Sequence, residues 1–255
     1  MLTPGIVVVD FETTGLSADW NRIIEVGAVI VRDGQVVDSF VELMHPGCRV
    51  PWEITALTGI TDAMLKGKPP PEKVMPAFRQ FLGDRVCVAH NAAFDSRFFM
   101  AEMQRAQLHH ARPFLCTMML ARRLVDDAPD HKLGTLVRHL GLRKPDHLRA
   151  HRALDDVLMT VALWNHLTAL LTARLGDRQP DFEVYHTLMK RPKAAAAKYL
   201  GQLAAKASRA APAATAAARV RGTSDPDAPH TVRSQQGCAR GSHRRDRRRR
   251  DARHP

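Results

Sequence analysis

The feature that most constrains the fold is a series of Val- and Ile-rich runs near the start of the chain. Three such runs cover residues 6–9, 23–31 and 35–43, and β-branched residues of this kind favour strands. The tripeptide RDG at residues 32–34 separates the last two runs and is typical of a hairpin turn. The sequence therefore predicts three consecutive strands joined as a meander.

Farther along the chain, segments with helical spacing alternate with short apolar runs. In residues 133–140, apolar side chains recur at i, i+3, i+4 and i+7, and Gly141 follows as a stop signal. Helices are predicted over residues 51–57, 71–82, 96–107, 133–140 and 153–171, with another ending at residue 124, and strands over residues 86–89 and 114–117. Strands that first follow one another and then alternate with helices predict an α/β fold, with a mixed β-sheet flanked by helices.

Charge is distributed unevenly along the chain. Residues 1–190 hold 22 of the 38 Lys and Arg residues and 22 of the 26 Asp and Glu residues, so the whole formal charge of +12 lies in residues 191–255. A basic extension of this kind indicates a polyanionic partner. Nucleic acid is favoured over a membrane because no amphipathic apolar face accompanies the charge. A solvated extension without a specific partner is the alternative.

The composition also changes at residue 193. Beyond it Ala and Arg dominate, and Phe, Ile and Trp are missing from the sequence. Such a segment buries too little apolar area to offset its ordering entropy, so we expect it to be mostly disordered, apart from one helix that residues 194–207 would allow. The predicted organisation is a folded domain over residues 1–175, a linker over residues 176–192 and a disordered basic tail over residues 193–255.

Cysteine usage and hydropathy indicate the compartment. The four cysteines, Cys48, Cys87, Cys116 and Cys238, show no C-x-x-C spacing, which fits a reducing environment. No basic residues precede the first apolar run, which is typical of a strand rather than a signal peptide. No stretch approaches the roughly 18 apolar residues that a membrane span needs. We therefore expect a cytoplasmic protein without a membrane partner.

Two acidic residues follow the first apolar run. Asp10 and Glu12 are two positions apart, and strand side chains alternate between faces, so both carboxylates should project from one face a few ångströms apart. Like charges at that range repel and raise each other's pKa unless a cation neutralises them. The sequence TTG at residues 13–15 predicts an immediate turn, which would leave the pair exposed at an edge of the sheet. A solvated strand end without a ligand is the alternative.

A third acidic residue, Asp95, lies near the start of a predicted helix, shortly after the strand predicted at residues 86–89. It is either a further cation ligand or a helix-capping residue, because Asp near a helix N-terminus accepts backbone N–H bonds and complements the dipole. His90 and Asn91 end the strand beside it. These two side chains either bind a substrate or satisfy backbone groups of the loop.

The last group of polar residues is HRALDD, residues 151–156. Five residues of helix rotate by roughly 500°, so His151 and Asp156 would point roughly 140° apart if both were helical. Either His151 precedes the helix on a loop, or its partner on the same face is Asp155. A general base suits a mobile loop, and we favour Asp156 as the cation ligand. A surface imidazole without a function is the alternative for His151.

Four motifs together carry a family resemblance. DFETTGL, ITALTGIT, AHNAAFD and HRALDD occur in this order over about residues 7–166. In order and spacing they resemble the motifs of the DEDDh 3′–5′ exonucleases. This DnaQ-like family includes exonuclease X and the proofreading subunits of bacterial replicative polymerases. The run CTMMLARRL, which ends at Leu124, is more similar to exonuclease X than to the proofreading subunits.

The resemblance implies a ribonuclease H-like fold and assigns roles to individual residues. It implies that two Mg²⁺ or Mn²⁺ ions are held by Asp10, Glu12, Asp95 and Asp156. His151 would be the general base, and its spacing to the last Asp agrees with the choice of Asp156. The residues that would border the terminal nucleotide are Thr13, Leu57, Asn91 and Phe94, although Phe94 is also explained as a core residue.

The expected function follows from this site. Two cations suit phosphodiester hydrolysis because they neutralise the anionic phosphate, activate a water and stabilise the leaving oxygen. We expect a 3′–5′ exonuclease that acts on DNA, mainly at single-stranded 3′ ends, and releases nucleoside 5′-monophosphates in proofreading or repair. Its partners would be nucleic acid and a polymerase. An exoribonuclease that trims RNA, or an inactive nucleic-acid-binding protein, are the alternatives, because the site chemistry does not distinguish the sugars.

Overall fold

The computed structural model describes residues 5–109, 114–142 and 152–219, with side chains described up to residue 206. The chain divides into a unit of residues 1–214 and a unit of residues 215–255. Of the second unit, only the end of a helix at residues 215–219 is described. The first unit contains the sheet and the site discussed below.

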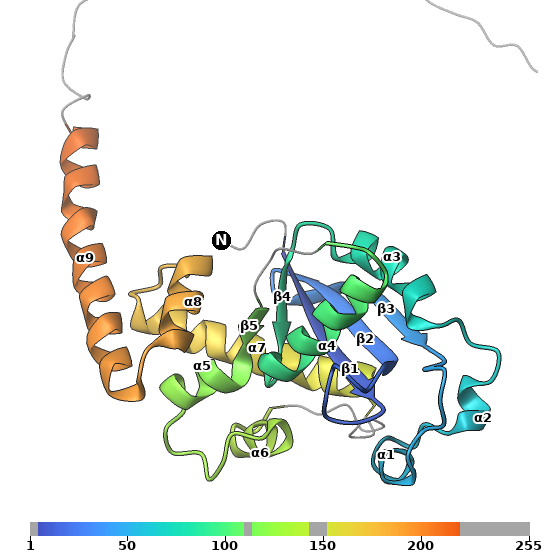
Figure 1. The fold of residues 1–255 in the computed structure, drawn as a ribbon. Coiled ribbons are helices and arrows are strands. Elements are labelled where there is room, and N and C mark those ends of the chain that lie inside the picture. Colours follow the sequence, from blue (N-terminus) through green and yellow to red (C-terminus); the bar gives the residue numbers. More distant parts are fainter. Residues whose placement is uncertain (1–4, 110–113, 143–151, 220–255) are drawn as a thin grey trace, which may run out of the picture. The chain divides into compact units, whose positions relative to one another are not determined.

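The first unit is built on a five-stranded mixed sheet (Figure 1). Its strands are β1 (Ile6–Thr13), β2 (Ile23–Arg32), β3 (Gln35–Leu43), β4 (Val86–Ala89) and β5 (Phe114–Cys116), in the spatial order β3-β2-β1-β4-β5. The first three strands pair antiparallel, whereas β1–β4 and β4–β5 are parallel. The predicted meander and the mixed sheet are therefore confirmed, and β1 is the central strand.

The hairpin between β2 and β3 forms at the predicted turn. Asp33 and Gly34 both have positive φ angles, of 50° and 76°. Two successive positive φ angles are what a tight turn between right-twisted strands requires, and Asp and Gly are among the residues that tolerate them. The turn sequence therefore sets the pairs Arg32–Gln35 and Val31–Val36, and an irregularity between Ile30 and Val31 shifts the register of the rest of β3.

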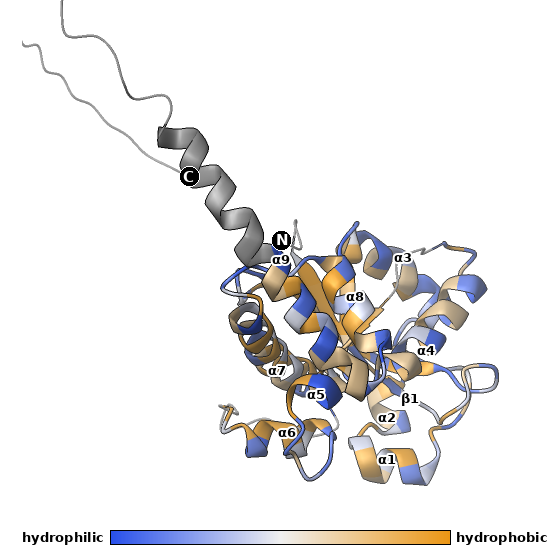
Figure 2. Ribbon diagram, turned by 90° about the vertical axis from the view of Figure 1, so that its left-hand side faces the viewer, coloured by the Kyte–Doolittle hydropathy of each residue, from blue (hydrophilic) through white to orange (hydrophobic). Residues whose placement is uncertain are grey.

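Nine helices are described (Figure 1). They are α1 (Trp52–Thr58), α2 (Asp62–Leu65), α3 (Pro71–Leu82), α4 (Ala92–Arg105), α5 (Thr117–Leu124), α6 (Leu133–His139), α7 (Ala153–Arg174), α8 (Phe182–Lys190) and α9 (Lys193–Arg219). Each helix predicted above is present within a few residues of its predicted bounds, and α2 and α8 are additional. The strands are mostly apolar and the helices combine apolar and polar residues (Figure 2).

Separate apolar cores cover the two faces of the sheet. On β1, Val7, Val9 and Phe11 pack into the core that contains α3 and α4, whereas Ile6 and Val8 pack into the core that contains α5, α6, α7 and α8. Strand side chains alternate between faces, so the even-numbered positions of β1 continue toward α7. This alternation places the side chains of Asp10 and Glu12 on the face that α7 covers.

The segment predicted as a linker contains a packed helix. Within residues 176–192, α8 buries Tyr185 and Leu188 in the same core as α7. Tyr185 also donates a hydrogen bond to the Thr168 hydroxyl of α7 at 3.0 Å. Two buried residues at i, i+3 spacing anchor a short helix, and this weak pattern is hidden by the polar residues around it. The packed body therefore extends beyond residue 175.

The beginning of the predicted tail is also helical. Helix α9 reaches Arg219 and is longer than the helix allowed over residues 194–207. Ala has the highest helix propensity, and Ala196 and Leu200 bury one side of the first turns against the core. The remainder of the predicted tail, residues 220–255, lies outside the described residues. Among the described residues, no helix is both long and apolar enough to cross a bilayer.

Candidate active site

Three carboxylates from distant parts of the chain meet at one point. Asp10 and Glu12 on β1 and Asp156 in the first turn of α7 each place a carboxylate oxygen within 4.8 Å of the others. The strand supplies two ligands of one face through its period of two, and the helix lying on that face supplies the third. This spacing suits a divalent cation held by oxygen ligands.

The sequence predicted that the acid pair on β1 would be exposed at an edge of the sheet, but the pair is not exposed. Strand β1 continues through Thr13, and its ladder with β2 persists to its end with an irregularity after Glu12, whereas its pairing with β4 covers only Ile6–Val8. Glu12 is only 9% exposed. The TTG sequence does mark the end of the strand, but a local turn signal carries no information about which elements pack over that end. The expectation of an exposed pair was therefore wrong.

Asp95 belongs to the same electrostatic cluster. It lies buried in the first turn of α4, whose N-cap residue is Asn91, so it is not the capping residue itself. Burial raises the pKa of Asp95 to about 8, with a contribution from Glu12, although backbone N–H groups of Asp95 and Phe11 lower it. Burial also raises the pKa of Asp10 well above 3.8, and among the nearby charges Asp95 contributes most.

The cluster favours bound protons or cations over free charge. Burial raises the pKa of Glu12 to about 7, helped by Asp156 and Glu25 and opposed by Arg152. Several carboxylates that hold protons near neutral pH form a site where a cation can replace those protons and relieve the repulsion. Oxygen ligands alone, at this spacing, fit Mg²⁺ or Mn²⁺ rather than a softer metal.

The structure distinguishes Asp156 from its neighbour. Asp156 contributes the third oxygen of the cluster, whereas Asp155 is one of the charges that raise the pKa of Arg152. Consecutive helical residues point about 100° apart, so only one of the two can face β1. The choice of Asp156 as the inward-facing residue agrees with this geometry. His151 lies outside the described residues.

Sequence reasoning missed a fifth acidic residue beside the cluster. Glu25 on β2 lies directly opposite Glu12 and is 1% exposed. It accepts two hydrogen bonds from Arg152, of 2.8 Å from Nη2 to Oε1 and 3.2 Å from Nε to Oε2. The backbone N–H of Ala153 donates to Oε2 at 3.1 Å. One charged residue within the apolar run IIEVGAVIV is the signal that indicates a buried, paired carboxylate.

A glycine lets α7 approach β2 closely. A Cβ atom built at Gly27 would lie 2.5 Å from the carbonyl carbon of Ala153 and 2.6 Å from the nitrogen of Leu154. Both neighbours are backbone atoms and cannot rotate away. The start of α7 therefore rests directly on the strand, in the same place where Glu25 holds Arg152.

The four residues predicted to border the nucleotide differ in their surroundings. Thr13 is buried and its hydroxyl donates to the Gly15 carbonyl at 2.6 Å. Asn91 is exposed with a φ of 63°, a conformation that Asn tolerates. Phe94 is half-buried with its ring centroid 4.8 Å from that of Phe98. Leu57 on α1 is 53% exposed.

His90 has a structural role. Its ring lies 2.9 Å from the Thr117 hydroxyl and 3.0 Å from the His131 carbonyl oxygen. Burial lowers its pKa to about 4, so the ring is neutral at physiological pH. Of the two alternatives left open by the sequence, these bonds favour the satisfaction of loop groups.

Exposed apolar residues near this end of the sheet were not anticipated. Trp20, in the loop after β1, is 88% exposed, and Leu16 in the same loop and Trp52 on α1 are also exposed. Figure 1 places this loop and α1 at the end of the sheet where β1 finishes. Exposed tryptophans on a loop and a helix at this end of the sheet offer flat surfaces on which nucleic-acid bases can stack.

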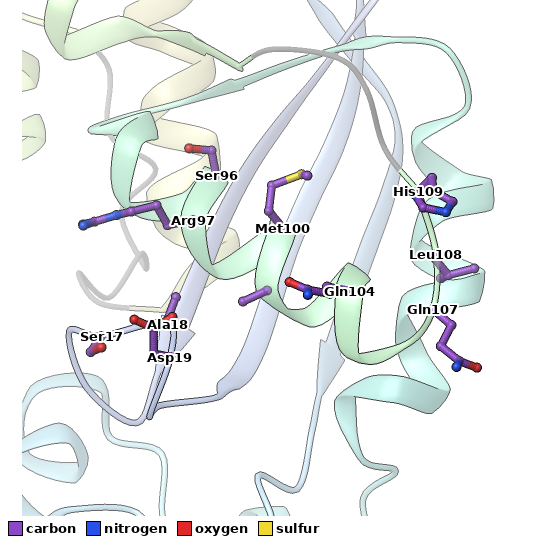
Figure 3. A pocket seen from close by; sticks show the side chains of 11 residues that line it. Ser17, Ala18, Asp19, Ser96, Arg97, Met100, Gln104, Gln107, Leu108 and His109 are labelled. Carbon is purple, nitrogen blue, oxygen red and sulfur yellow. The ribbon is translucent and has the colours of Figure 1, made fainter.

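A cleft of about 900 Å³ lies between the loop after β1 and the outer face of α4 (Figure 3). Ser96 and Arg97, which follow Asp95 directly, form part of its wall, together with Met100 and Gln104. Asp19 on the loop side balances the charge of Arg97. The cleft is therefore large enough for a nucleotide but is not strongly basic.

Comparisons with known proteins identify the family. The family model RNase_T, described as exonuclease, matches residues 7–164. The chain is 41% identical over 157 residues to a DNA polymerase III of the PolC type from Clostridium perfringens, which covers 62% of this chain and 11% of that protein. A PolC-type polymerase from Halalkalibacterium halodurans is 42% identical over 161 residues, with 63% and 11% covered. The chain thus spans about a tenth of the length of these relatives.

Solved structures agree with the family model. A structure of exonuclease X in complex with 5′ overhanging duplex DNA is 32% identical, with a TM-score of 0.53, and the match covers 64% of this chain and 91% of that chain. Escherichia coli exonuclease I in complex with a dT13 oligonucleotide has a TM-score of 0.58 at 17% identity, with 68% and 42% covered, and shares the fold. The chain belongs to the RNase_T exonuclease family, the DnaQ-like nucleases with a ribonuclease H-like fold whose motifs it carries.

Proposed function

We propose that the protein is a 3′–5′ exonuclease that hydrolyses DNA with the help of two divalent cations, Mg²⁺ or Mn²⁺. The observation that carries this proposal is the convergence of Asp10, Glu12 and Asp156 within 4.8 Å, with the charge of Asp95 raising the pKa of Asp10. Four buried or half-buried acids without a cation would be costly to ionise, and that cost is the usual mark of a site built to bind one.

The acidic residues and the histidine of the site have different roles. Asp10, Glu12, Asp95 and Asp156 bind and orient the cations. When bound, the cations supply positive charge to the reacting phosphate. His151 accepts a proton from the attacking water, which an imidazole does well near neutral pH. The products are a nucleoside 5′-monophosphate and a chain shortened by one residue.

DNA is the proposed substrate because the similar proteins act in that context. The PolC-type relatives are DNA polymerases by name, and the exonuclease X structure contains duplex DNA. Exposed Leu57, Trp20 and Trp52 suit the bases of a single-stranded 3′ end, since base stacking contributes roughly 1–3 kcal/mol per base. The similarity to PolC-type proteins supports a role in proofreading or repair with a polymerase as partner.

Degradation of end-labelled oligonucleotides tests the proposal. Single-stranded DNA, duplex DNA and RNA of one sequence are incubated with Mg²⁺ or Mn²⁺. A 5′ label should yield a ladder that shortens one nucleotide at a time, whereas a 3′ label should appear at once as a mononucleotide. Asp10→Asn, purified in parallel, is the matched control and should leave every substrate intact.

Four results would contradict parts of this function. Internal cleavage would contradict exonuclease action, and early release of a 5′ label would contradict the polarity. Preference for RNA would replace DNA as the substrate and favour the exoribonuclease alternative. Binding without hydrolysis in either metal would favour an inactive nucleic-acid-binding protein.

A further inference from the structure

We propose that the Glu25–Arg152 ion pair is a positioning device, which holds the first turn of α7 on β2 and so sets Asp156 opposite Asp10 and Glu12. The inference rests on the proposed function in that it treats these acids as the cation site. It concerns residues outside that site, and it makes a statement about α7 that can be measured without nucleic acid.

The contacts fix both the side chain and the backbone at the start of α7. Glu25 engages Arg152 through two nitrogens and also accepts the N–H of Ala153. A fork of this kind restrains direction as well as distance. Asp156 is one helical turn beyond Arg152, or about 6 Å along the axis, so displacement at the pair moves Asp156 directly.

The first turn depends on Arg152 in a second way. The carbonyl oxygen of Arg152 accepts hydrogen bonds from the amides of Asp155 and Asp156, at 2.9 and 3.0 Å. Helix ends fray readily unless something restrains them. Glu25 therefore anchors the residue on which the first two helical hydrogen bonds close, and Gly27 allows that turn to reach the strand.

The two charges of the pair act in opposite directions on one carboxylate of the cluster. Glu25 raises the pKa of Glu12, and Arg152 lowers it. A device that worked by charge alone would not place both signs beside the same carboxylate. Opposite signs beside Glu12 are consistent with a pair that restrains α7.

A second buried pair in the same domain provides a matched control. Glu102 on α4 is fully buried and binds the Arg22 guanidinium at 2.8 and 3.0 Å, and the backbone N–H of Ile23 donates to it at 3.4 Å. Both glutamates are therefore buried and accept from a guanidinium and a backbone N–H, and Glu102 also accepts from the Arg105 guanidinium at 3.1 Å. Glu102 lies two helical turns beyond Asp95 and its contacts hold β2 to α4, not α7 to β2.

The experiment compares Glu25→Gln, Arg152→Met and Arg152→Lys with Glu102→Gln. Mn²⁺ affinity is measured by titration calorimetry, and amide hydrogen exchange is measured at Asp155 and Asp156 in the metal-free protein. Glu25→Gln and Arg152→Met should each weaken Mn²⁺ binding by about tenfold or more and speed exchange in the first turn. The Mn²⁺ affinity and the exchange rate of Arg152→Lys should lie between those of these variants and the wild type. Lysine keeps the positive charge but lacks the two-nitrogen geometry of the guanidinium.

The control separates positioning from general destabilisation. Glu102→Gln should lower the thermal midpoint but leave Mn²⁺ affinity and exchange at Asp156 unchanged. If the pair acted through its charge alone, the Mn²⁺ affinities of Glu25→Gln and Arg152→Met would change in opposite directions. Loss of Glu25 would weaken cation binding, whereas loss of Arg152 would strengthen it. Tighter Mn²⁺ binding by Arg152→Met, or unchanged exchange in Glu25→Gln, would overturn the proposal.

Catalytic constants add a further readout. In Glu25→Gln, kcat should fall by about tenfold or more with KM within a factor of two, and equal changes in Glu102→Gln would argue against positioning. If Arg152→Met does not fold, Glu25→Gln and Arg152→Lys decide the result. If the wild type neither binds Mn²⁺ nor cleaves DNA, the proposed function fails, while hydrogen exchange still decides whether the pair restrains α7.

Discussion

Glu12 on β1 and Glu25 on β2 face each other across the antiparallel ladder, yet their carboxylates serve different neighbours. Glu12 joins the cluster with Asp10 and Asp156, whereas Glu25 is held by the guanidinium of Arg152. Like charges directly opposite each other destabilise a sheet unless each has a partner. The arrangement is therefore stable only if Arg152 stays paired and the cluster receives protons or cations.

The ligand assignment predicts unequal effects at two adjacent residues. Asp156→Ala should lower kcat by more than about a hundredfold, because it removes a ligand rather than an outer contact, and Asp10→Ala should do the same. Asp155→Ala should change kcat only slightly, since Asp155 lies about 100° around the helix from Asp156. Steady-state hydrolysis of labelled single-stranded DNA measures both. A larger loss in Asp155→Ala would reverse the assignment.

The raised pKa values predict how the stability of the metal-free protein depends on pH. Burial raises the pKa of Glu12 from 4.5 to about 7 and that of Asp95 from 3.8 to about 8. Between these ordinary and raised values the folded protein holds protons that the unfolded chain releases, so stability should fall as pH rises from about 4 to about 8. Thermal unfolding in EDTA at several pH values measures this.

Two additions sharpen this measurement. Mn²⁺ should raise the midpoint, and by more at pH 8 than at pH 5.5, because it no longer competes with protons. Glu12→Gln cannot ionise and should flatten the pH dependence. A metal-free midpoint that rises between pH 5.5 and pH 8 would contradict the predicted sign.

His151 is predicted to act on the chemical step. His151→Ala should lower kcat by about 10² to 10⁴ and leave KM nearly unchanged, as expected for a general base that acts in the transition state. The fall in kcat on the acidic side of neutral pH should also vanish. A variant in which KM rises and kcat stays constant would assign His151 to substrate binding instead.

Leu57 and Phe94 were both expected beside the terminal nucleotide, and their burial predicts different outcomes. Leu57 is 53% exposed, so Leu57→Ala should weaken binding of single-stranded DNA and leave the thermal midpoint unchanged. Phe94 packs against the core beside Phe98, so Phe94→Ala should lower the midpoint as well. Fluorescence anisotropy and thermal unfolding separate the two effects. Equal binding by Leu57→Ala and the wild type would remove Leu57 from the substrate site.

The basic C-terminal segment is predicted to bind nucleic acid through its charge. Residues 220–255 contain ten Arg and four Asp residues. Deleting them should weaken DNA binding and flatten its dependence on salt, by about 0.9 in log–log slope for each phosphate that the shortened chain no longer neutralises. The cut belongs after Arg219 because Ala196 and Leu200 are part of the core. An unchanged slope in a salt titration would indicate an inert extension.

The sequence predicted what depends on local spacing. The meander, the shared face of Asp10 and Glu12, and the helix that carries Asp156 all follow from periods of two and 3.6 residues within single segments. The resemblance of four motifs supplied the rest of the candidate site, including Asp95. These predictions needed no knowledge of which segments lie side by side.

Features that depend on tertiary neighbours were not predictable in this way. Glu25 and Arg152 are 127 positions apart, and no local pattern in either segment indicates that the two residues form a pair. The exposure of the acid pair was predicted wrongly because a turn signal does not reveal which elements pack over the end of β1. Residues 176–192 were taken as a linker because only Tyr185 and Leu188 anchor α8 among polar neighbours.

Gly27 determines how closely α7 can approach β2, and so affects the spacing of the whole site. Its missing side chain leaves no gap to fill, because the backbone of Ala153 and Leu154 already occupies that space. Any larger residue would push the start of α7 away from β2 and move the carboxylate of α7 away from the other two. The spacing of the carboxylates around a cation thus depends on the absence of a Cβ atom at Gly27. This residue lies on β2, a strand that contributes no ligand of its own.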